Sequence, residues 1–166
     1  MPTLSSWKDP LPAVSWSLPI GKYHPAGFGY SKNHNVHTGI DLYVPESSSV
    51  HSVEAGTVID IFNFTGPKTL YPQLLPTEAI VIHGATGLVL YGELQVLKDI
   101  QFGQLIGAGT KIANIICAVP DQPMLHLELH KPGSKIPSVW KQGQPQPKSL
   151  LDPTSYLLSL KTYTKR

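Results

Sequence analysis

The sequence predicts a mainly β protein that folds as a single domain of antiparallel strands, a sandwich or barrel-like sheet. Sixteen prolines and fourteen glycines are spread along its 166 residues, and both residue types interrupt helices. Short runs rich in strand-forming residues lie between turn signals, where proline and glycine are tolerated. A chain of this length is expected to bury one core of its own.

The elements can be assigned in chain order. Residues 1–26 form a Pro-rich arm that we expect to pack on the body through Trp7 and Trp16. Residues 27–30 read as a turn and 31–35 as a loop. The predicted strands, in order, are 50–54, 57–63, 79–83, 88–94, 111–119 and 124–130.

The connections carry their own signals. Gly84-Ala85-Thr86-Gly87 joins two predicted strands as a hairpin. Residues 64–77 contain three prolines and are predicted to form a long excursion of the kind that often borders a binding site. Residues 104–109 read as a turn and 140–147 as a loop. The single predicted helix covers 153–161 with Asp152 as its N-cap, and 159–166 form a basic tail after the 27–158 domain.

Composition excludes several classes of protein. The formal charge is +2 and the lysines are scattered, whereas a nucleic-acid-binding face needs clustered Lys and Arg. One cysteine excludes an internal disulfide, and Cys117 lies in an apolar run that predicts a buried small hydrophobe. No apolar window is long enough to span a membrane and no signal peptide is visible. We therefore expect a monomer without nucleic-acid or membrane partners; the compartment stays open.

Two histidines and a carboxylate form the pattern with the clearest chemistry. His37-Thr38-Gly39-Ile40-Asp41 is followed far downstream by Met124-Leu125-His126-Leu127-Glu128, and His37, Asp41 and His126 match a catalytic zinc site with one open position. Four residues of extended chain span roughly 13 Å, so His37 and Asp41 can share a metal only if the chain bends, which Gly39 allows.

Strand periodicity predicts which side chains share a face. In 124–130, Met124, His126, Glu128 and His130 point one way and the three leucines the other. The polar row is predicted to line a site. The same rule places Val89, Tyr91 and Glu93 on one face of 88–94, and Leu88, Leu90 and Leu94 on the other.

These residues resemble the lysostaphin and LytM-type zinc endopeptidases, which hydrolyse peptide bridges in bacterial peptidoglycan. The matching segments, in order, are 27–30, 37–42, 50–58, 80–84, 88–94, 103–107, 125–128 and 151–157. The resemblance covers roughly 27–158 and implies a lysostaphin-like fold, the duplicated hybrid motif, with long loops around a groove. It also implies a zinc cofactor held by His37, Asp41 and His126, and a peptide or peptidoglycan-like substrate.

The chain departs from the family at two catalytic positions. The Tyr-x-His-Leu segment of the family reads Tyr91-Gly92-Glu93-Leu94 here, and its His-Leu-His strand reads Met124-Leu125-His126. Zinc lowers the pKa of a bound water molecule, so Glu93 is a candidate general base, as in other metalloproteases. Met124, however, cannot donate a hydrogen bond to an oxyanion.

The residues leave three functions open. The first is a divergent metallopeptidase with Glu93 as base. In the second, Glu93 closes the metal shell and the protein is an inactive zinc-bearing binding module. The third is a metal-free scaffold. Six further residues could orient the ligands or contact the substrate, and each could equally serve ordinary packing or face solvent: Glu128, His83, Tyr91, Asn33, His130 and Met124.

Overall fold

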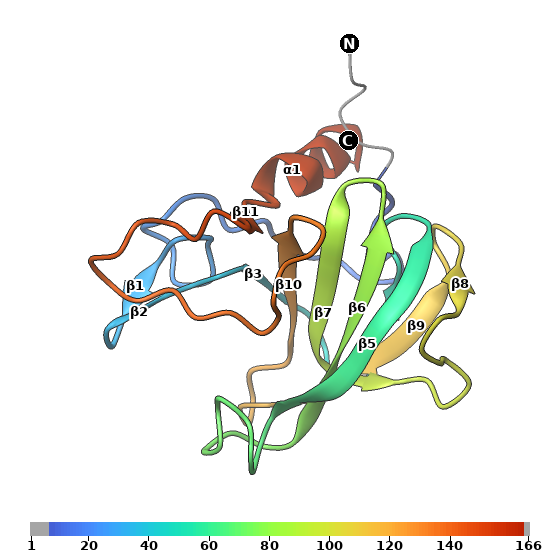
Figure 1. Cartoon of the computed structure of the whole chain (residues 1–166). Helices are drawn as coiled ribbons and strands as arrows, with labels where there is room; N and C mark the ends of the chain where they lie inside the picture. Colours follow the sequence, from blue (N-terminus) through green and yellow to red (C-terminus); the bar gives the residue numbers. More distant parts are fainter. Residues whose placement is uncertain (1–6, 165–166) are drawn as a thin grey trace.

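A computed structural model describes residues 7–164 and shows a mainly β architecture, as predicted (Figure 1). One large antiparallel sheet carries the strands β11-β10-β7-β6-β5-β8 in that spatial order, with β3 and β9 branching from it and β4 pairing with β9. Its bounds are β3 Ile40–Tyr43, β4 Ser49–His51, β5 Gly56–Thr65, β6 Thr77–Gly84, β7 Gly87–Val96, β8 Leu105–Ile106, β9 Lys111–Ile115, β10 Met124–His130 and β11 Leu150–Leu151.

A short hairpin and one helix lie outside this sheet. β1 (Ser31–Lys32) and β2 (Asn35–Val36) pair as a separate hairpin, so the prediction of a plain loop at 31–35 was wrong. Asn33 and His34 adopt φ of 52° and 69°, the left-handed conformation that a two-residue hairpin turn requires and that Asn tolerates well. The helix α1 runs over Thr154–Thr164, slightly beyond the predicted 153–161.

The two faces of the sheet bury different clusters. On one face Ile80, Ile82, Val89, Tyr91 and the leucines of β10 join the main core. The opposite face carries a smaller cluster of Phe64, Ala79, Val81, Leu88 and Leu90, against which Tyr71 and Ile136 pack from the long connections. The excursion between β5 and β6 therefore folds back onto this second face.

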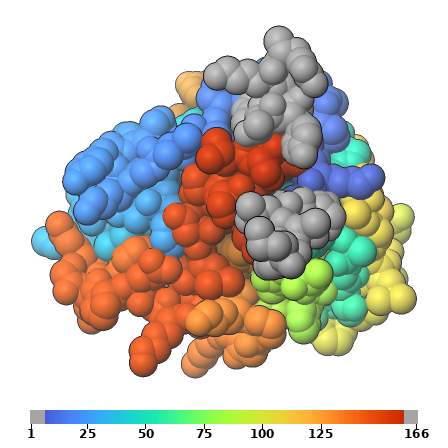
Figure 2. Space-filling view, turned by 90° about the horizontal axis from the view of Figure 1, so that it is seen from above, coloured from blue at the N-terminus to red at the C-terminus, as the bar shows by residue number. Residues whose placement is uncertain are grey.

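The N-terminal arm is part of the main core. Trp7, Leu11 and Trp16 are buried in it, and the Trp7 ring stacks on Tyr156 of α1 with centroids 4.8 Å apart. The backbone N–H of Lys8 donates to the carbonyl of Val53. Seen from above, the medium-blue part of the early chain lies next to the orange segment after β10 at the left, while the darkest blue residues lie at the right (Figure 2). The division into arm, domain and tail stays a prediction.

Cys117 is half-buried, so the expectation of a fully buried thiol was wrong: the residue follows the end of β9 and has left the sheet.

Among residues 7–164, no helix has both the length and the apolar character needed to span a membrane.

Candidate metal centre

The centre is built where β3 lies beside β10. In the antiparallel register Asp41 stands directly opposite His126, and opposite residues project to the same face of a sheet. His37 lies before β3, which begins at Ile40, and the chain bends at Gly39 between them. A Cβ on Gly39 would lie 2.3 Å from the carbonyl oxygen of Leu127, so glycine is required for this close approach.

Three donor atoms converge at this point. One nitrogen of His37, a carboxylate oxygen of Asp41 and one nitrogen of His126 all lie within 4.8 Å of one another. His37 Nε2 is 3.2 Å and His126 Nδ1 is 2.8 Å from Asp41 Oδ1. His37 Nδ1 donates to the carbonyl oxygen of Gly27 at 2.9 Å. This assigns the proton of His37 to Nδ1 and leaves Nε2 facing its neighbours.

A second, buried carboxylate holds the other side of His126. His126 Nε2 donates to Glu128 Oε2 at 2.7 Å, and the hydroxyl of Thr38 donates to the same oxygen at 2.8 Å. His130 Nε2 donates to Glu128 Oε1, also at 2.7 Å. Glu128 thus fixes both the ring orientation and the tautomer of His126, the usual arrangement behind a metal-binding imidazole.

The charges of these groups depend on one another. Burial alone would raise the pKa of Asp41, yet hydrogen bonds from His126 and His37 hold it well below its usual range. Burial opposes the charge on Glu128 too, but His126 and His130 lower its pKa to about 2. Burial disfavours charge on His126, while Asp41 and Glu128 raise its pKa well above the usual value. Without a metal, the site is a chain of alternating charges.

Glu93 reaches this face through a bulge in β7. Glu78 of β6 pairs with Leu94 and Ile80 pairs with Tyr91, so Gly92 and Glu93 together face the single residue between the two on β6, the pattern of a β-bulge. Glu93 has φ of 64°. The bulge lies where β7 stops pairing with β10 and begins pairing with β9.

The bulge overturns the predicted faces of 88–94. Leu94 joins Tyr91 and Val89 in the main core, while Leu90 lies in the second cluster. The extra residue shifts the alternation by one, so the expectation that Leu94 shares a face with Leu90 was wrong. Burial raises the pKa of Glu93 to about 7, and the charge of Asp41 adds to the rise while His126 opposes it. The charges of Asp41 and His126 therefore both act on the Glu93 carboxyl group.

The other predicted site residues are more dispersed. Tyr91 is fully buried in the main core, where its hydroxyl accepts from the backbone N–H of Val53 at 2.9 Å, and burial raises its pKa. His83 is exposed at the end of β6, and Asn33 is exposed in the β1–β2 turn. Met124 and His130 are buried on the polar face of β10.

Three contributors were not among the predicted site residues. Thr38 anchors Glu128; its place beside His37 is the one signal that could have indicated it. The Phe64 ring stacks on His126 with centroids 5.4 Å apart, and Tyr71 packs on Phe64 at 5.8 Å. Both aromatic residues come from the region of the excursion, whose path has no periodicity to interpret.

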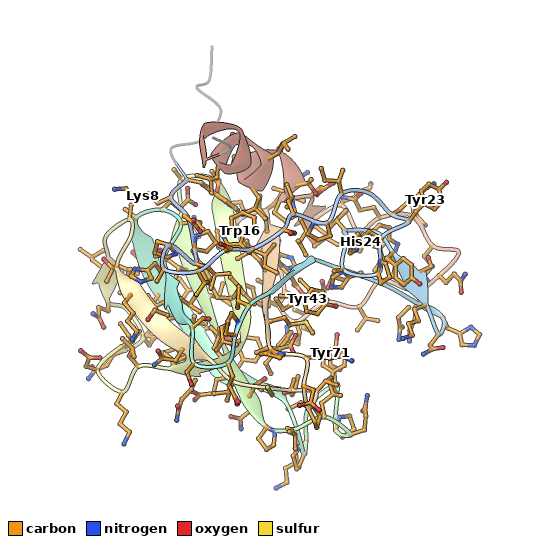
Figure 3. All side chains as sticks on the ribbon, turned by 180° about the vertical axis from the view of Figure 1, so that it is seen from behind. Lys8, Trp16, Tyr23, His24, Tyr43 and Tyr71 are labelled. Atoms are coloured by element: carbon orange, nitrogen blue, oxygen red, sulfur yellow. The ribbon has the colours of Figure 1, made fainter. Side chains whose placement is uncertain are left out.

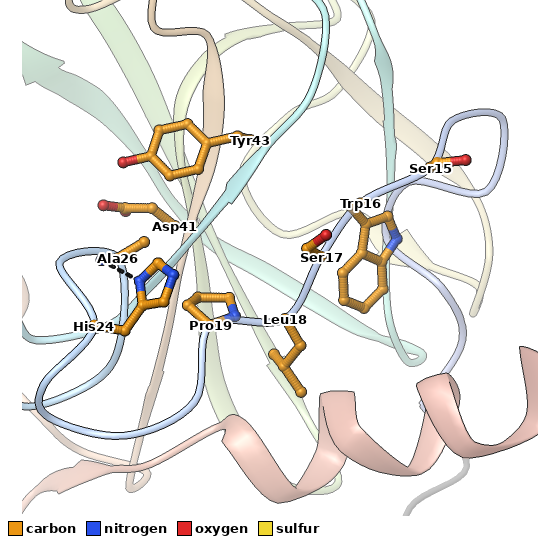
Figure 4. A pocket seen from close by; sticks show the side chains of 9 residues that line it. All are labelled: Ser15, Trp16, Ser17, Leu18, Pro19, His24, Ala26, Asp41 and Tyr43. Atoms are coloured by element: carbon orange, nitrogen blue, oxygen red, sulfur yellow. Dashed lines mark hydrogen bonds between the residues drawn. The ribbon is translucent and has the colours of Figure 1, made fainter. Parts of the chain in front are cut away.

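Two cavities border the three donor residues, and both are lined by Tyr43. One, of about 390 Å³, is lined by Asp41, Tyr43 and residues of the arm that include Trp16, Leu18 and His24 (Figure 4). The other, of about 530 Å³, is lined by His37, Thr38, Tyr43 and His126. Its remaining walls are Pro25, Tyr30, Lys32, Asn35, Val36, Leu70, Tyr71 and residues 138–141. Figure 3 shows Tyr43 and Tyr71 near each other on this side of the molecule.

Comparison with solved structures places this fold. The protein cbpa from L. salivarius REN is 20% identical, with a TM-score of 0.59 over 96% of this chain and 98% of that one. The catalytic domain of the antimicrobial peptidase lysostaphin from Staphylococcus simulans is 16% identical, with a TM-score of 0.57 over 86% and 92%. A variant of the catalytic domain of the prophage-encoded M23 protein EnpA from Enterococcus faecalis is 18% identical, with a TM-score of 0.53 over 83% of this chain and 88% of that one.

Sequence comparison gives the family directly. No curated protein shows significant similarity to the chain. The model of peptidase family M23, however, matches residues 35–138, a span that begins just before His37 and ends after His126 and Glu128. Because this match covers more than half of the sequence, the chain belongs to peptidase family M23.

Proposed function

We propose that the protein is a zinc metallopeptidase that hydrolyses peptide bonds, with the cross-bridge peptides of peptidoglycan as the substrate class that the family suggests. One observation carries the proposal: the donor atoms of His37, Asp41 and His126 lie within 4.8 Å of one another. The two cavities that border these residues and share Tyr43 leave room for an extended peptide.

The donor set suits zinc. Two imidazole nitrogens and one carboxylate oxygen are ligands that Zn²⁺ accepts in catalytic sites with an open position. The outer nitrogens of both histidines already have partners, Gly27 and Glu128, so only the inner nitrogens face the site. When bound, zinc would acidify a water molecule and polarise the substrate carbonyl.

Glu93 is the candidate for moving the proton. Burial raises the pKa of its carboxyl group, which makes a carboxylate a better proton acceptor near neutral pH. Glu93 would take a proton from the attacking water as the new carbon–oxygen bond forms. It would return that proton to the amine nitrogen as the carbon–nitrogen bond breaks, so the charge and the atoms balance.

The rival function is an inactive zinc-bearing module in which Glu93 is a fourth ligand. Among the residues that the structure describes, the converging group contains His37, Asp41 and His126 without Glu93. This favours the base over the ligand, and with it the peptidase over the module.

The substitution Glu93→Gln tests the choice. It removes the proton acceptor and keeps the size of the side chain, so we expect at least a hundredfold loss of kcat with about one equivalent of zinc retained. Release of free amine groups from purified peptidoglycan sacculi and from short peptides measures the rate, and elemental analysis measures the metal.

The exposed carboxylate Glu46 provides a matched control, and Glu46→Gln should leave rate and zinc unchanged. Wild-type rates in Glu93→Gln would remove Glu93 from the mechanism. Loss of zinc in that variant would instead support the fourth-ligand module, and a zinc-loaded wild type that cleaves none of the substrates would reject the peptidase.

A further inference from the structure

With methionine at position 124, this side chain cannot stabilise the oxyanion that forms during peptide hydrolysis. A peptide carbonyl under attack develops a negative oxygen, and hydrogen-bond donors aimed at that oxygen lower the barrier. Met124 lies on the site face of β10, two residues before His126, but its thioether has no hydrogen to donate. A hydrogen-bond donor to that oxygen, acting beside the metal, would therefore have to come from another element.

Tyr43 stands next to that position. In the β3–β10 register Tyr43 lies directly opposite Met124, and Asp41 directly opposite His126. Residues opposite each other have Cβ atoms roughly 5 Å apart on the same face. Asp41 and Tyr43 also share a face, because they are two residues apart on one strand. Figure 4 shows both side chains projecting to the same side of β3.

The phenol of Tyr43 is open to a ligand. Tyr43 is 48% exposed, whereas Met124, opposite it in the register, is 6% exposed. Tyr43 lines the cavity that contains Asp41 and also the cavity that contains His37 and His126. It therefore stands at the junction of the two cavities, where the bond to be cleaved would lie in an extended peptide that occupies both.

We propose that the hydroxyl of Tyr43 donates the hydrogen bond that stabilises the developing oxyanion, in place of a donor at position 124. The proposal rests on the peptidase function above. A phenol donates one hydrogen and stays protonated at neutral pH, so the task needs no change of charge.

Tyr30 and Tyr71 are the competing phenols. Both line the cavity with His37 and His126, and neither lines the cavity with Asp41. The ring of Tyr71 packs on Phe64, which in turn covers His126. Both positions suit contact with one side of the substrate, while Tyr43 alone of the three phenols borders both cavities.

The test removes one oxygen atom. Tyr43→Phe should lower kcat by on the order of 10²-fold, with KM and zinc content unchanged. Binding provides a second readout that does not depend on turnover: the zinc-loaded variant should bind a phosphinate pseudopeptide, which presents an oxyanion, at least tenfold more weakly than wild type. Affinity for the product peptide should stay the same. Tyr23→Phe is the control, since Tyr23 is 85% exposed and lies outside both cavities.

A relocated donor separates hydrogen bonding from packing. Tyr43→Ala should lose activity and phosphinate affinity. The double variant Tyr43→Ala, Met124→His should recover at least tenfold of both, because the new imidazole can donate a hydrogen bond from the space that the Tyr43 ring has left. Equal phosphinate affinity in wild type and Tyr43→Phe overturns the role of Tyr43, as does a loss confined to Tyr30→Phe or Tyr71→Phe. Failure of the wild type to cleave any substrate overturns the peptidase instead, and the phosphinate comparison still decides whether Tyr43 faces an oxyanion.

Discussion

At the residue scale, His126 shows how completely one side chain can be specified. Nδ1 faces Asp41 at 2.8 Å and Nε2 donates to Glu128 at 2.7 Å, while Phe64 covers the ring. Glu128 is itself held by Thr38 and His130. Because each neighbour constrains a different atom of the imidazole, the ring has one orientation before any metal arrives, which lowers the cost of ordering a ligand on binding.

The buried Glu93 predicts how stability depends on pH in the zinc-free protein. Folding raises the pKa of this carboxyl from 4.5 to about 7, first through burial and then through the charge of Asp41. Between these pH values the folded state holds a proton that the unfolded state has released. The free energy of unfolding should therefore fall as pH rises from about 4.5 to 7, by on the order of 3 kcal/mol at most.

Urea unfolding of chelated wild type and Glu93→Gln at pH 5 and pH 7.5 checks this. The amide cannot ionise, so the variant should gain stability relative to wild type at the higher pH. The comparison cancels the histidines that titrate in both proteins. An equal difference between the two proteins at both pH values would contradict a raised pKa for Glu93.

At the element scale, the register between β3 and β10 determines the site. It places Asp41 opposite His126 and Tyr43 opposite Met124, and it depends on the backbones meeting at Gly39. A Cβ there would approach the carbonyl oxygen of Leu127 to 2.3 Å and Cγ of Glu128 to 2.8 Å. The first of these atoms is backbone, so the overlap can be relieved only by separating the chains.

Gly39→Ala should therefore be costly. Overpacking of a well-packed site typically costs about 1–3 kcal/mol, and the displaced strand would move Asp41 away from His126. We expect this loss of stability in urea together with zinc affinity at least tenfold weaker, measured by competition with a chelator. Gly107→Ala is a suitable control, because its added Cβ meets its nearest atom, Oγ1 of Thr110, at 3.4 Å. A Gly39→Ala variant with wild-type stability and zinc affinity would show that the two chains do not need this contact.

The sequence predicts best the elements that are defined by a pattern within their own residues. β10 matches the predicted 124–130, because alternating leucines and polar residues define its ends and both its faces. The donor atoms of His37, Asp41 and His126, which the sequence suggested as metal ligands, do converge in space, and their role as ligands stays a prediction. The position of Glu93 could not be predicted in this way. The bulge that reorients it arises where β7 exchanges β10 for β9, and a change of partner leaves no periodic mark in the strand itself.

At the scale of the whole molecule, the site joins segments that are remote in sequence. His37 and Asp41 precede most of the sheet, His126 lies near its end, and the arm and the β5–β6 excursion supply walls of the two cavities. The unfolded chain has no such arrangement of donors. A metal that binds them therefore binds the folded state, and its binding energy adds to folding stability.

Zinc should accordingly raise the unfolding temperature of the protein. Free metal at a hundred times its dissociation constant stabilises a one-site protein by about 2.7 kcal/mol, which corresponds to a shift of roughly 5–10 °C for a domain of this size. Calorimetry of chelated and zinc-loaded protein measures the shift. His37→Ala or His126→Ala should abolish it together with the bound metal, whereas His83→Ala, at the exposed end of β6, should retain both. A native wild type that contains no zinc and unfolds at the same temperature with and without it would mean that the three donors hold one another through the Asp41 ion pairs alone.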